Sequence, residues 1–494
     1  MLRCGPDSQT GSVAGCRGIR NHSIKKNLSE DRQMSRHLYV YIICIIAALG
    51  GLLFGLDQGF INGSLELIKK EFHWTTMQGE TFASIMLVGC IFGAIASGWL
   101  AHTLGRKKTL LLAAVIFAVF TSLGALTSSQ FILFFSRFCL GLAVGSASFC
   151  VPLYLSEIAP TSLRGGFISM YQLMITIGIF MIYISNSLIE KHFESWRLML
   201  GVIAVPAIIM FVAVFFIPQT PRWLMLKNRQ AEAKDVLEKT RFDKAEVNEE
   251  MAAIKESLDE QESLSFWHII SQGYFIKVLC LGIFLQLLQQ LSGINCVIYY
   301  SSMIFKNAGF IDPAVGTIVI GLVNVMATIV AVKYVDKWGR KPIMYVGLTI
   351  MAITLILIGI IFHIREHILP GNHLGMVDEI VMLSATILYI IAFAVSLGPI
   401  IWVICAEIFP LKVRDMGMTV TTLTNWAGAY IVVQFSMSAM EHFGGSVLFF
   451  FFALCCIAGY FLVGLFTPET KGVALETIET NLKNGRKLRL LGND

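Results

Sequence analysis

The chain has 494 residues, of which 55% are hydrophobic and only 14% are charged. Soluble proteins carry about 25% charged residues, so this composition excludes an ordinary soluble enzyme, a disordered chain and a nucleic-acid-binding protein. The formal net charge of +5 therefore needs an explanation other than an acidic partner. We expect a polytopic membrane protein.

Twelve apolar runs in the chain are long enough to cross a membrane. A membrane-spanning helix needs about 20 mainly apolar residues, because each residue adds 1.5 Å against a hydrocarbon core of about 30 Å. The run length, and the need to satisfy every backbone group within the membrane, favour helices over strands. The runs lie near 38–61, 81–101, 109–128, 131–154, 166–189, 199–217, 276–298, 314–335, 342–363, 381–404, 414–438 and 446–467.

Lysine and arginine residues are distributed unequally between the two sides of the predicted membrane. With the N-terminus in the cytoplasm, the cytoplasmic loops and both tails contain 31 of the 38 Lys and Arg residues, whereas the opposite loops contain six. Cytoplasmic loops of membrane proteins carry this excess. We therefore expect a multi-pass protein of the cell membrane with both termini in the cytoplasm. The basic excess requires no nucleic-acid partner.

The second half of the chain repeats motifs of the first half. The segment SEIAP at 156–160, followed by Arg164, recurs 250 residues later as AEIFP, followed by Arg414. PQT at 218–220 recurs at the same offset as PET, and GRK at 105–107 recurs 234 residues later. Three such matches in order indicate a duplicated six-helix unit. The predicted fold class is therefore an all-α polytopic membrane protein with 12 transmembrane helices in two pseudo-symmetric six-helix halves.

A single long hydrophilic insertion divides the twelve runs into six and six. Its middle, at 231–239, carries acids and bases at helical spacing, which favours a short exposed helix. The predicted organisation is a cytoplasmic N-terminal tail at 1–37, an N-terminal six-helix half at 38–217, a cytoplasmic linker with short helices at 218–275, a C-terminal six-helix half at 276–467 and a cytoplasmic tail at 468–494.

The charged residues of the repeated motifs lie on the predicted cytoplasmic side. Two halves that rock about a central cavity need contacts there that break readily. Each repeated Glu precedes an Arg by seven residues, which places both on one face of a helix. We expect a cytoplasmic latch formed by Arg106, Glu157, Arg164, Asp336, Arg340, Glu407 and Arg414. The basic residues of the GRK turns are equally compatible with simple topology anchors.

Charged residues inside the predicted spans are few: Asp57 in the first and Arg137 in the fourth. A charge at membrane depth is costly, so such residues are usually functional. Asp57 lies in GLLFGLDQG at 51–59, whose glycines recur every four residues and permit close helix packing. A carboxylate whose surroundings change between two states can carry a proton. A fixed structural pair between Asp57 and Arg137 is the alternative.

Uncharged polar residues gather in the seventh run. Gln286, Gln289 and Gln290 are spaced i, i+3 and i+4 and therefore line one face of a helix. Asn295 follows in the same run, beyond a break at Ser292-Gly293. Other runs contribute the amides of Gln172, Asn324 and Asn425 and the indole of Trp402. Groups that both donate and accept hydrogen bonds, with an aromatic platform, suit a neutral polyhydroxylated solute. Interhelical hydrogen bonding could explain any one of these amides.

Several longer motifs resemble those of sugar porters of the major facilitator superfamily. They are GLLFGLDQG at 51–59, RFCLGLAVG at 137–145, PLYLSEIAP at 152–160, MYQLMITIG at 170–178, QQLSGIN at 289–295, VDKWGRKP at 335–342, TNW at 424–426 and PETKG at 468–472. Over residues 34–494 the chain is similar to the bacterial galactose–proton symporters, and nearly as similar to the arabinose–proton and xylose–proton symporters. The motifs are highly specific for the family and much less specific for the sugar.

The resemblance implies a sugar pocket formed by Gln172, Gln289, Gln290, Asn295, Tyr299, Asn324, Trp402 and Asn425. It also implies a flexible break at Gly398-Pro399 beside Trp402, and proton coupling through Asp57 that Arg137 modulates. Two positions depart from the family pattern, and both concern the first-half latch. His102 replaces a frequent acid, and residues 218–222 read PQTPR instead of the usual PESPR.

We therefore expect proton-coupled symport of a neutral monosaccharide into the cell by alternating access. The expected sugar is a galactose-like hexose, with arabinose and xylose as alternatives.

A passive facilitator shares nearly every motif but needs no titratable group at Asp57, and a sugar sensor is disfavoured by the short tail after Pro468. The runs contain no nucleophile–base set and no metal-ligand spacing, so we expect neither an enzyme nor a metal or other cofactor, the proton being the coupling ion. The expected partners are a small neutral sugar, protons and the lipid bilayer, and we expect a monomer.

Overall fold

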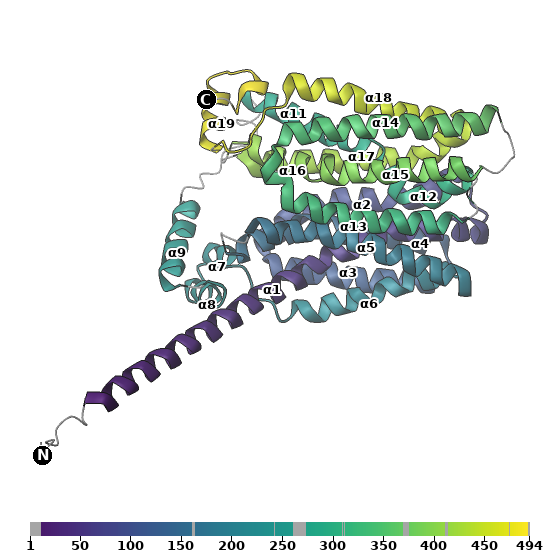
Figure 1. Ribbon diagram of the computed structural model, residues 1–494. Helices are drawn as coiled ribbons and strands as arrows, with labels where there is room; N and C mark the ends of the chain where they lie inside the picture. Colours follow the sequence, from purple (N-terminus) through teal and green to yellow (C-terminus); the bar gives the residue numbers. More distant parts are fainter. Residues whose placement is uncertain are drawn as a thin grey trace, which may run out of the picture.

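The computed structural model describes residues 11–160, 164–241, 243–259, 273–308, 310, 312–368, 375–410, 413–473 and 475–492. Within these residues the regular structure is helical throughout, and none of them lies in a β-strand. Figure 1 shows the long helices lying side by side, with the short helices gathered at one end of the bundle. The predicted all-α fold class is confirmed.

The first half consists of six long helices. They are α1 (Gly11–Phe72), α2 (Thr76–Thr103), α3 (Arg106–Leu126), α4 (Gln130–Ile158), α5 (Arg164–Phe193) and α6 (Trp196–Val214). α1 packs along α5, and α2 packs along α4. The close approach of α1 to α5 depends on glycine, because a Cβ added at Gly55 would collide with the carbonyl of Ile175. The predicted role of the glycines in GLLFGLDQG is thereby confirmed.

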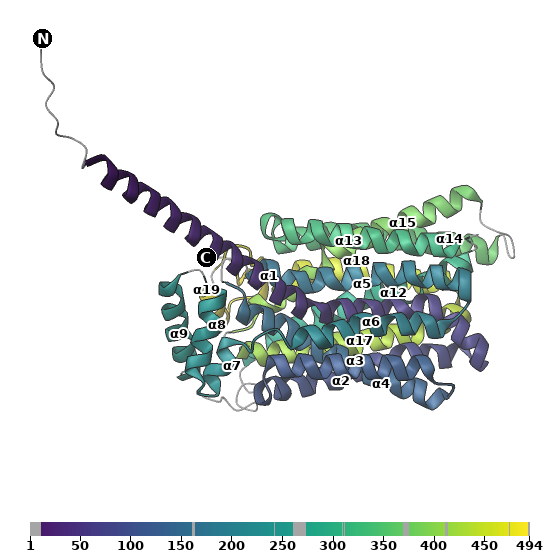
Figure 2. The ribbon, with the colours of Figure 1, turned by 90° about the horizontal axis from the view of Figure 1, so that it is seen from below.

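Short helices connect the two halves and follow the second one. The connecting helices are α7 (Pro221–Leu226), α8 (Gln230–Thr240) and α9 (Lys244–Asp259), and α19 (Leu475–Lys483) and the 3₁₀ turn η2 (Leu488–Leu490) follow the last long helix. All of the short α-helices lie at the same end of the bundle (Figures 1 and 2). We call this end the linker end, and the other the far end.

The second half repeats the first, except that two of its spans are broken. It consists of α11 (Gly273–Leu291), α12 (Ile294–Ala308), α13 (Pro313–Trp338), α14 (Arg340–His367), α15 (Met376–Val395), α16 (Leu397–Ile408), α17 (Arg414–Phe443) and α18 (Gly445–Phe466). α11 and α12 together form one span, and α15 and α16 form another.

The break between α11 and α12 lies where the sequence predicted it. Gly293 has φ of 89°, a left-handed conformation that favours glycine. The break between α15 and α16 is at Ser396, which has φ of −112° and ψ of −91°. The prediction of a break at Gly398-Pro399 is therefore wrong by two residues. Pro399 stands in the first turn of α16, where a helix tolerates proline because the missing N–H would have no intrahelical acceptor.

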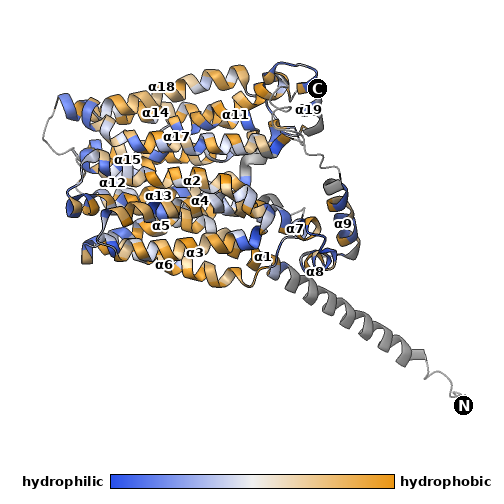
Figure 3. Ribbon diagram, turned by 180° about the vertical axis from the view of Figure 1, so that it is seen from behind, coloured by the Kyte–Doolittle hydropathy of each residue, from blue (hydrophilic) through white to orange (hydrophobic). Residues whose placement is uncertain are grey.

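Eleven stretches of helix in the described part of the chain are long and apolar enough to cross a membrane. The one predicted span that is not among these eleven, 414–438, is α17, a helix of 30 residues that carries more polar side chains than the others. It packs against α2, α11 and α18, so its polar groups have protein partners. Large apolar side chains such as Trp99, Val205 and Leu454 are exposed on other helices. Figure 3 shows that the long helices are mainly hydrophobic along their lengths, as a lipid-facing surface requires.

The two halves meet along three helix pairs: α1 with α12, α2 with α17, and α5 with α13. The contacts between the halves gather from the middle of the bundle to the far end. Near the middle, the rings of Phe54 and Trp426 lie 5.6 Å apart. Toward the far end, the Asn62 amide donates to the Ser301 hydroxyl at 2.5 Å, and the Lys306 ammonium contacts the Glu66 carboxylate at 3.1 Å.

Candidate functional site

Asp57 and Arg137 form a buried ion pair inside the first half. An Arg137 guanidinium nitrogen lies 2.5 Å from an Asp57 carboxylate oxygen, and both residues have no exposed surface. The pair joins α1 to α4. The close packing of α1 against its neighbours, made possible by glycine, removes water from around the two charges. Their mutual attraction offsets part of the cost of burying them.

The surroundings of the pair leave hydrogen-bonding capacity unused. The guanidinium carbon lies 5.8 Å from the ring centre of Phe60 and 5.4 Å from that of Phe82, and the second terminal nitrogen lies 3.4 Å from the Met86 sulfur. Among the described residues, no group hydrogen-bonds to the second carboxylate oxygen of Asp57. That oxygen is a place where a proton can add without displacing Arg137.

The amides predicted to bind a sugar form a connected network in the second half. The Asn425 amide on α17 donates to the side-chain oxygens of Gln286 and Gln289 on α11, at 2.7 Å each. Gln290 donates to Gln289 at 3.2 Å, and Asn295 on α12 donates to Gln290 at 2.6 Å. Every member except Asn295 is at most 7% exposed. We call these five residues the amide cluster.

The amide cluster also contacts both breaks of the second half. Asn295 lies just beyond the break between α11 and α12. The Gln289 amide donates to the backbone carbonyls of Leu397 and Gly398, at 2.8 and 3.3 Å, just beyond the break between α15 and α16. Broken helices expose backbone groups that can bind a solute or another side chain. The cluster therefore lies where the helices of this half are least regular.

Gln58 connects the amide cluster to the first half, and the sequence analysis did not select it. Its amide donates to the side-chain oxygen of Asn295 at 2.9 Å, and it is 6% exposed. Gln58 directly follows Asp57 in the chain, so this bond ties the backbone that carries the buried acid to the cluster. Its position directly after Asp57 was the available signal.

The other residues of the predicted sugar pocket lie outside this hydrogen-bonded network. Tyr299 on α12 is fully buried, its hydroxyl has no partner among the described residues, and it lies within electrostatic reach of Arg137 and Asp57. Asn324 is buried on α13. Trp402 on α16 is half-buried, and Gln172 on α5 is exposed. These four side chains can contact parts of a solute that the amide cluster does not bind.

Trp426 is a second residue that the sequence analysis did not assign to the site. It directly follows Asn425 and is 7% exposed, and its indole N–H has no hydrogen-bond partner within the described part of the chain. Its ring lies edge-on to Phe54 of α1. An unpaired indole N–H next to the amide cluster is a donor that a hydroxyl group could use.

The residues of the predicted cytoplasmic latch pair within each half at the linker end. Arg106 contacts Glu157 at 2.7 Å in the first half, and Arg340 contacts Glu407 at 2.8 Å in the second. Arg414 lies at the first turn of α17 and is partly buried. The side chains of Arg164 and Asp336 lie outside those that the structure describes.

The two departures from the family pattern take part in first-half contacts of their own. The Gln219 side-chain oxygen accepts from the Lys107 backbone N–H at 3.2 Å, and its amide donates to the Leu104 carbonyl at 3.2 Å. The His102 carbonyl accepts from the Trp223 indole at 3.0 Å. A carboxylate at position 219 could not make the bond to Leu104, because it has no proton to donate.

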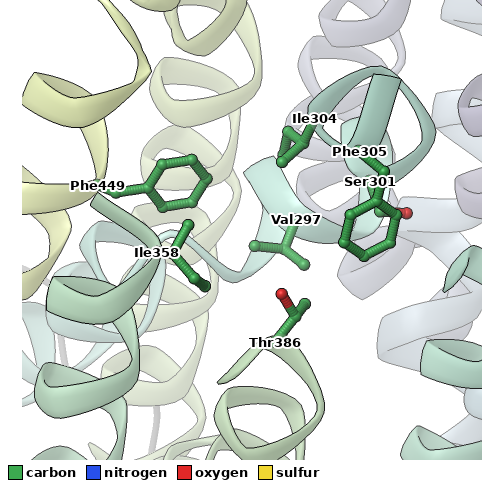
Figure 4. A pocket seen from close by; sticks show the side chains of 7 residues that line it. All are labelled: Val297, Ser301, Ile304, Phe305, Ile358, Thr386 and Phe449. Carbon is green, nitrogen blue, oxygen red and sulfur yellow. The ribbon is translucent and has the colours of Figure 1, made fainter. Parts of the chain in front are cut away.

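A small apolar cavity lies elsewhere in the second half, away from the amide cluster. Figure 4 shows its lining: Val297, Ser301, Ile304, Phe305, Ile358, Thr386 and Phe449. None of these belongs to the predicted sugar pocket. The cavity has few polar groups to orient a hydroxylated solute, so it suits a sugar less well than the amide cluster does.

Comparison with known proteins identifies the family. Residues 43–482 match the family model described as "Sugar (and other) transporter". The chain belongs to this family. It is 42% identical to the galactose-proton symporter of Escherichia coli, over 93% of this chain and 97% of the relative. It is 36% identical to the arabinose-proton symporter of the same organism, over 94% of this chain and 97% of the relative.

The fold comparison agrees with the sequence comparison. The inward-open conformation of the xylose transporter XylE from E. coli matches with a TM-score of 0.76 and 28% identity, over 90% of this chain and 99% of XylE. The chain is therefore a multi-pass membrane protein with the major facilitator fold. The family resemblance inferred from the motifs is confirmed. The relatives are transporters, as expected for a chain that was not predicted to be an enzyme.

Proposed function

We propose that this chain carries out proton-coupled symport of a neutral monosaccharide across a cell membrane by alternating access. The observation that carries the proposal is the bond from Gln58 to Asn295. It connects a neutral amide cluster, suited to hydroxyl groups, to the helix that bears the buried Asp57–Arg137 pair. Sugar binding and proton binding thereby act on one connected structure. A galactose-like hexose is the first candidate, because the relative with 42% identity is a galactose-proton symporter.

The chemistry of the two sites fits this assignment. Amide side chains offer both donors and acceptors, as each hydroxyl of a sugar requires, and they carry no charge that would favour an ionic solute. Asp57 accepts a proton at its unpaired carboxylate oxygen. When it is neutral, its attraction for Arg137 is lost, and the packing of α1 against α4 can change. Movement of α1 reaches the sugar site through Gln58.

The sidedness follows from charge and contacts together. The linker end carries most of the Lys and Arg residues, so we place it in the cytoplasm, with both termini on that side. The contacts between the halves gather toward the far end, which supports an inward-facing state for this structure. We further propose that the protein works as a monomer, with residues 218–275 as a cytoplasmic linker and no cofactor other than the transported proton.

Uptake by proteoliposomes tests the proposal. The purified protein is reconstituted and offered labelled galactose, glucose, arabinose and xylose, each with and without a pH gradient. A symporter accumulates its sugar above the outside concentration only when the outside is acidic. A passive facilitator equilibrates the sugar and never accumulates it at any pH. Uptake of none of these sugars would contradict the proposed substrate class.

A further inference from the structure

A seam of polar side chains joins α2 to α17 near the far end of the bundle. Met77, Glu80, Thr81 and Ser84 are spaced i, i+3, i+4 and i+7 and therefore line one face of α2. On α17 they meet Gln434: its side-chain oxygen accepts from the Ser84 hydroxyl at 2.6 Å, and its amide donates to Thr81 at 3.2 Å. The seam connects the first half to the second.

Glu80 makes the most bonds across this seam. One of its carboxylate oxygens accepts from the backbone N–H groups of Met437 and Ser438, at 2.6 and 2.8 Å. The other accepts from the Ser438 hydroxyl. Glu80 is only 1% exposed, so these donors replace water around a buried acid. Hydrogen bonds to a charged acceptor are about twice as strong as neutral ones.

The two N–H donors lie inside α17, not at its end. In a regular helix, the N–H of Met437 would donate to the carbonyl of Val433. The Val433 carbonyl accepts from the Tyr300 hydroxyl at 2.7 Å. Glu80 thus bonds to N–H groups in the interior of α17, where the Val433 carbonyl also bonds to Tyr300. The same helix carries Asn425 of the amide cluster about three turns away, because 3.6 residues make one turn.

We propose that Glu80 is a positioning residue of the transport cycle, an outer latch whose carboxylate holds the two halves together at the far end while the amide cluster faces the linker end. The inference rests on the proposed function only in assigning the far end to the extracellular side. A sugar that enters from that side must pass between the halves, so the bonds of Glu80 break on opening and water takes the place of the neutral donors. A buried cation at this position would bind the carboxylate more strongly and would oppose that step.

The test measures opening of the seam directly and needs no transported sugar. Ser84 is fully buried at the seam, so Ser84→Cys provides a thiol that a membrane-impermeant maleimide reaches only when the seam opens. Labelling at residue 84 is quantified by peptide mass spectrometry in proteoliposomes, with and without Glu80→Gln. We expect labelling about ten times faster with Glu80→Gln, since a hydrogen bond to a charged group contributes at least that factor.

Glu66→Gln is the matched control, because Glu66 also bridges the halves, to Lys306, but its side chain is 43% exposed. We expect it to change the labelling rate less than twofold, as exposed pairs contribute little. Equal rates for Glu80→Gln and the unaltered seam would overturn the proposal, and so would an equal acceleration by Glu66→Gln.

A second variant keeps the test decisive if Glu80→Gln does not fold. Ser438→Ala removes one of the three donors, and we expect labelling roughly threefold faster, the smaller effect of a single hydrogen bond. No acceleration in this variant would overturn the proposal. If the seam behaves as expected but no sugar is transported, the latch stands and the proposed function fails.

Discussion

The first half of this chain buries a charged pair, Asp57 with Arg137, whereas the second half buries a cluster of neutral amides. The two halves share repeated motifs, yet their buried polar groups differ in charge. Under the proposed function, one copy of the six-helix unit serves the proton and the other serves the neutral solute.

The physical reason is the different cost of burying the two kinds of group. A charge pair inside a membrane protein is stable only while both partners are present and close. Its energy therefore responds steeply to protonation. A cluster of amides has no such dependence, because its members satisfy one another at any pH. A coupled transporter needs one site of each kind, with a connection between them.

Loss of the charge from the first half should have the largest effect. Asp57→Asn mimics the neutral acid, so we expect it to abolish uphill uptake driven by a pH gradient while sugar binding and sugar exchange persist. Addition of sugar to de-energised cells should alkalinise the medium for the native protein and not for the variant. Asp235→Asn, which alters an exposed carboxylate on α8, should behave like the native protein. Continued accumulation by Asp57→Asn would show that the coupling acid lies elsewhere.

Loss of one amide from the second half should weaken the sugar site without affecting coupling. Gln289→Ala removes one of the two acceptors of the Asn425 amide, the acceptor of the Gln290 amide, and two bonds to the chain beyond Ser396. We expect sugar binding to weaken by roughly 1–3 kcal/mol, measured by equilibrium binding in detergent. Gln130→Ala, an exposed amide at the start of α4, is the control. Unchanged affinity for Gln289→Ala would remove α11 from the site.

The connection between the halves can be tested at Gln58. Gln58→Leu removes the bond to Asn295 but leaves Asp57 and Arg137 in place. We expect a loss of roughly 0.5–1.5 kcal/mol in sugar affinity, the net contribution of one neutral hydrogen bond. The proton-to-sugar ratio, measured from paired uptake of both, should fall below that of the native protein. A ratio and an affinity that both stay unchanged would show that the halves communicate by another path.

The linker ends of the two halves offer the smallest and most closely matched test. The Thr470 hydroxyl donates to Glu407 at 2.5 Å. The hydroxyl of the equivalent Thr220 is buried and has no partner among the described residues, and neither has the second carboxylate oxygen of Glu157. We expect Thr470→Val to lower the free energy of unfolding by about 1 kcal/mol and Thr220→Val to leave it nearly unchanged. Denaturation in mixed micelles measures both. Equal losses would mean that the two latches are equally bonded.

The sequence by itself determined the properties that depend on local composition. Run lengths predicted the spans, the Lys/Arg bias predicted the orientation, and the repeated motifs predicted two halves. Asp57 and Arg137 stood out because charges are rare in apolar runs. The Gln286, Gln289 and Gln290 face followed from helical periodicity alone. Each of these signals can be seen within one segment of the sequence, or by comparing two segments. They therefore predict structure without any knowledge of how the helices pack.

Only the tertiary structure decided which of these groups meet. Gln58 and Asn295 are 237 residues apart, and Glu80 and Ser438 are 358 apart. A hydropathy pattern does not distinguish Gln58 or Glu80 from other polar residues of the first half. Their hydrogen-bond partners lie in the second half, far away in the sequence. Gln172 is exposed on α5, and its place in the sugar pocket stays a prediction. Contacts of this kind depend on how helices of different halves pack in one state of the transport cycle. The residue pattern of a single segment does not specify that packing.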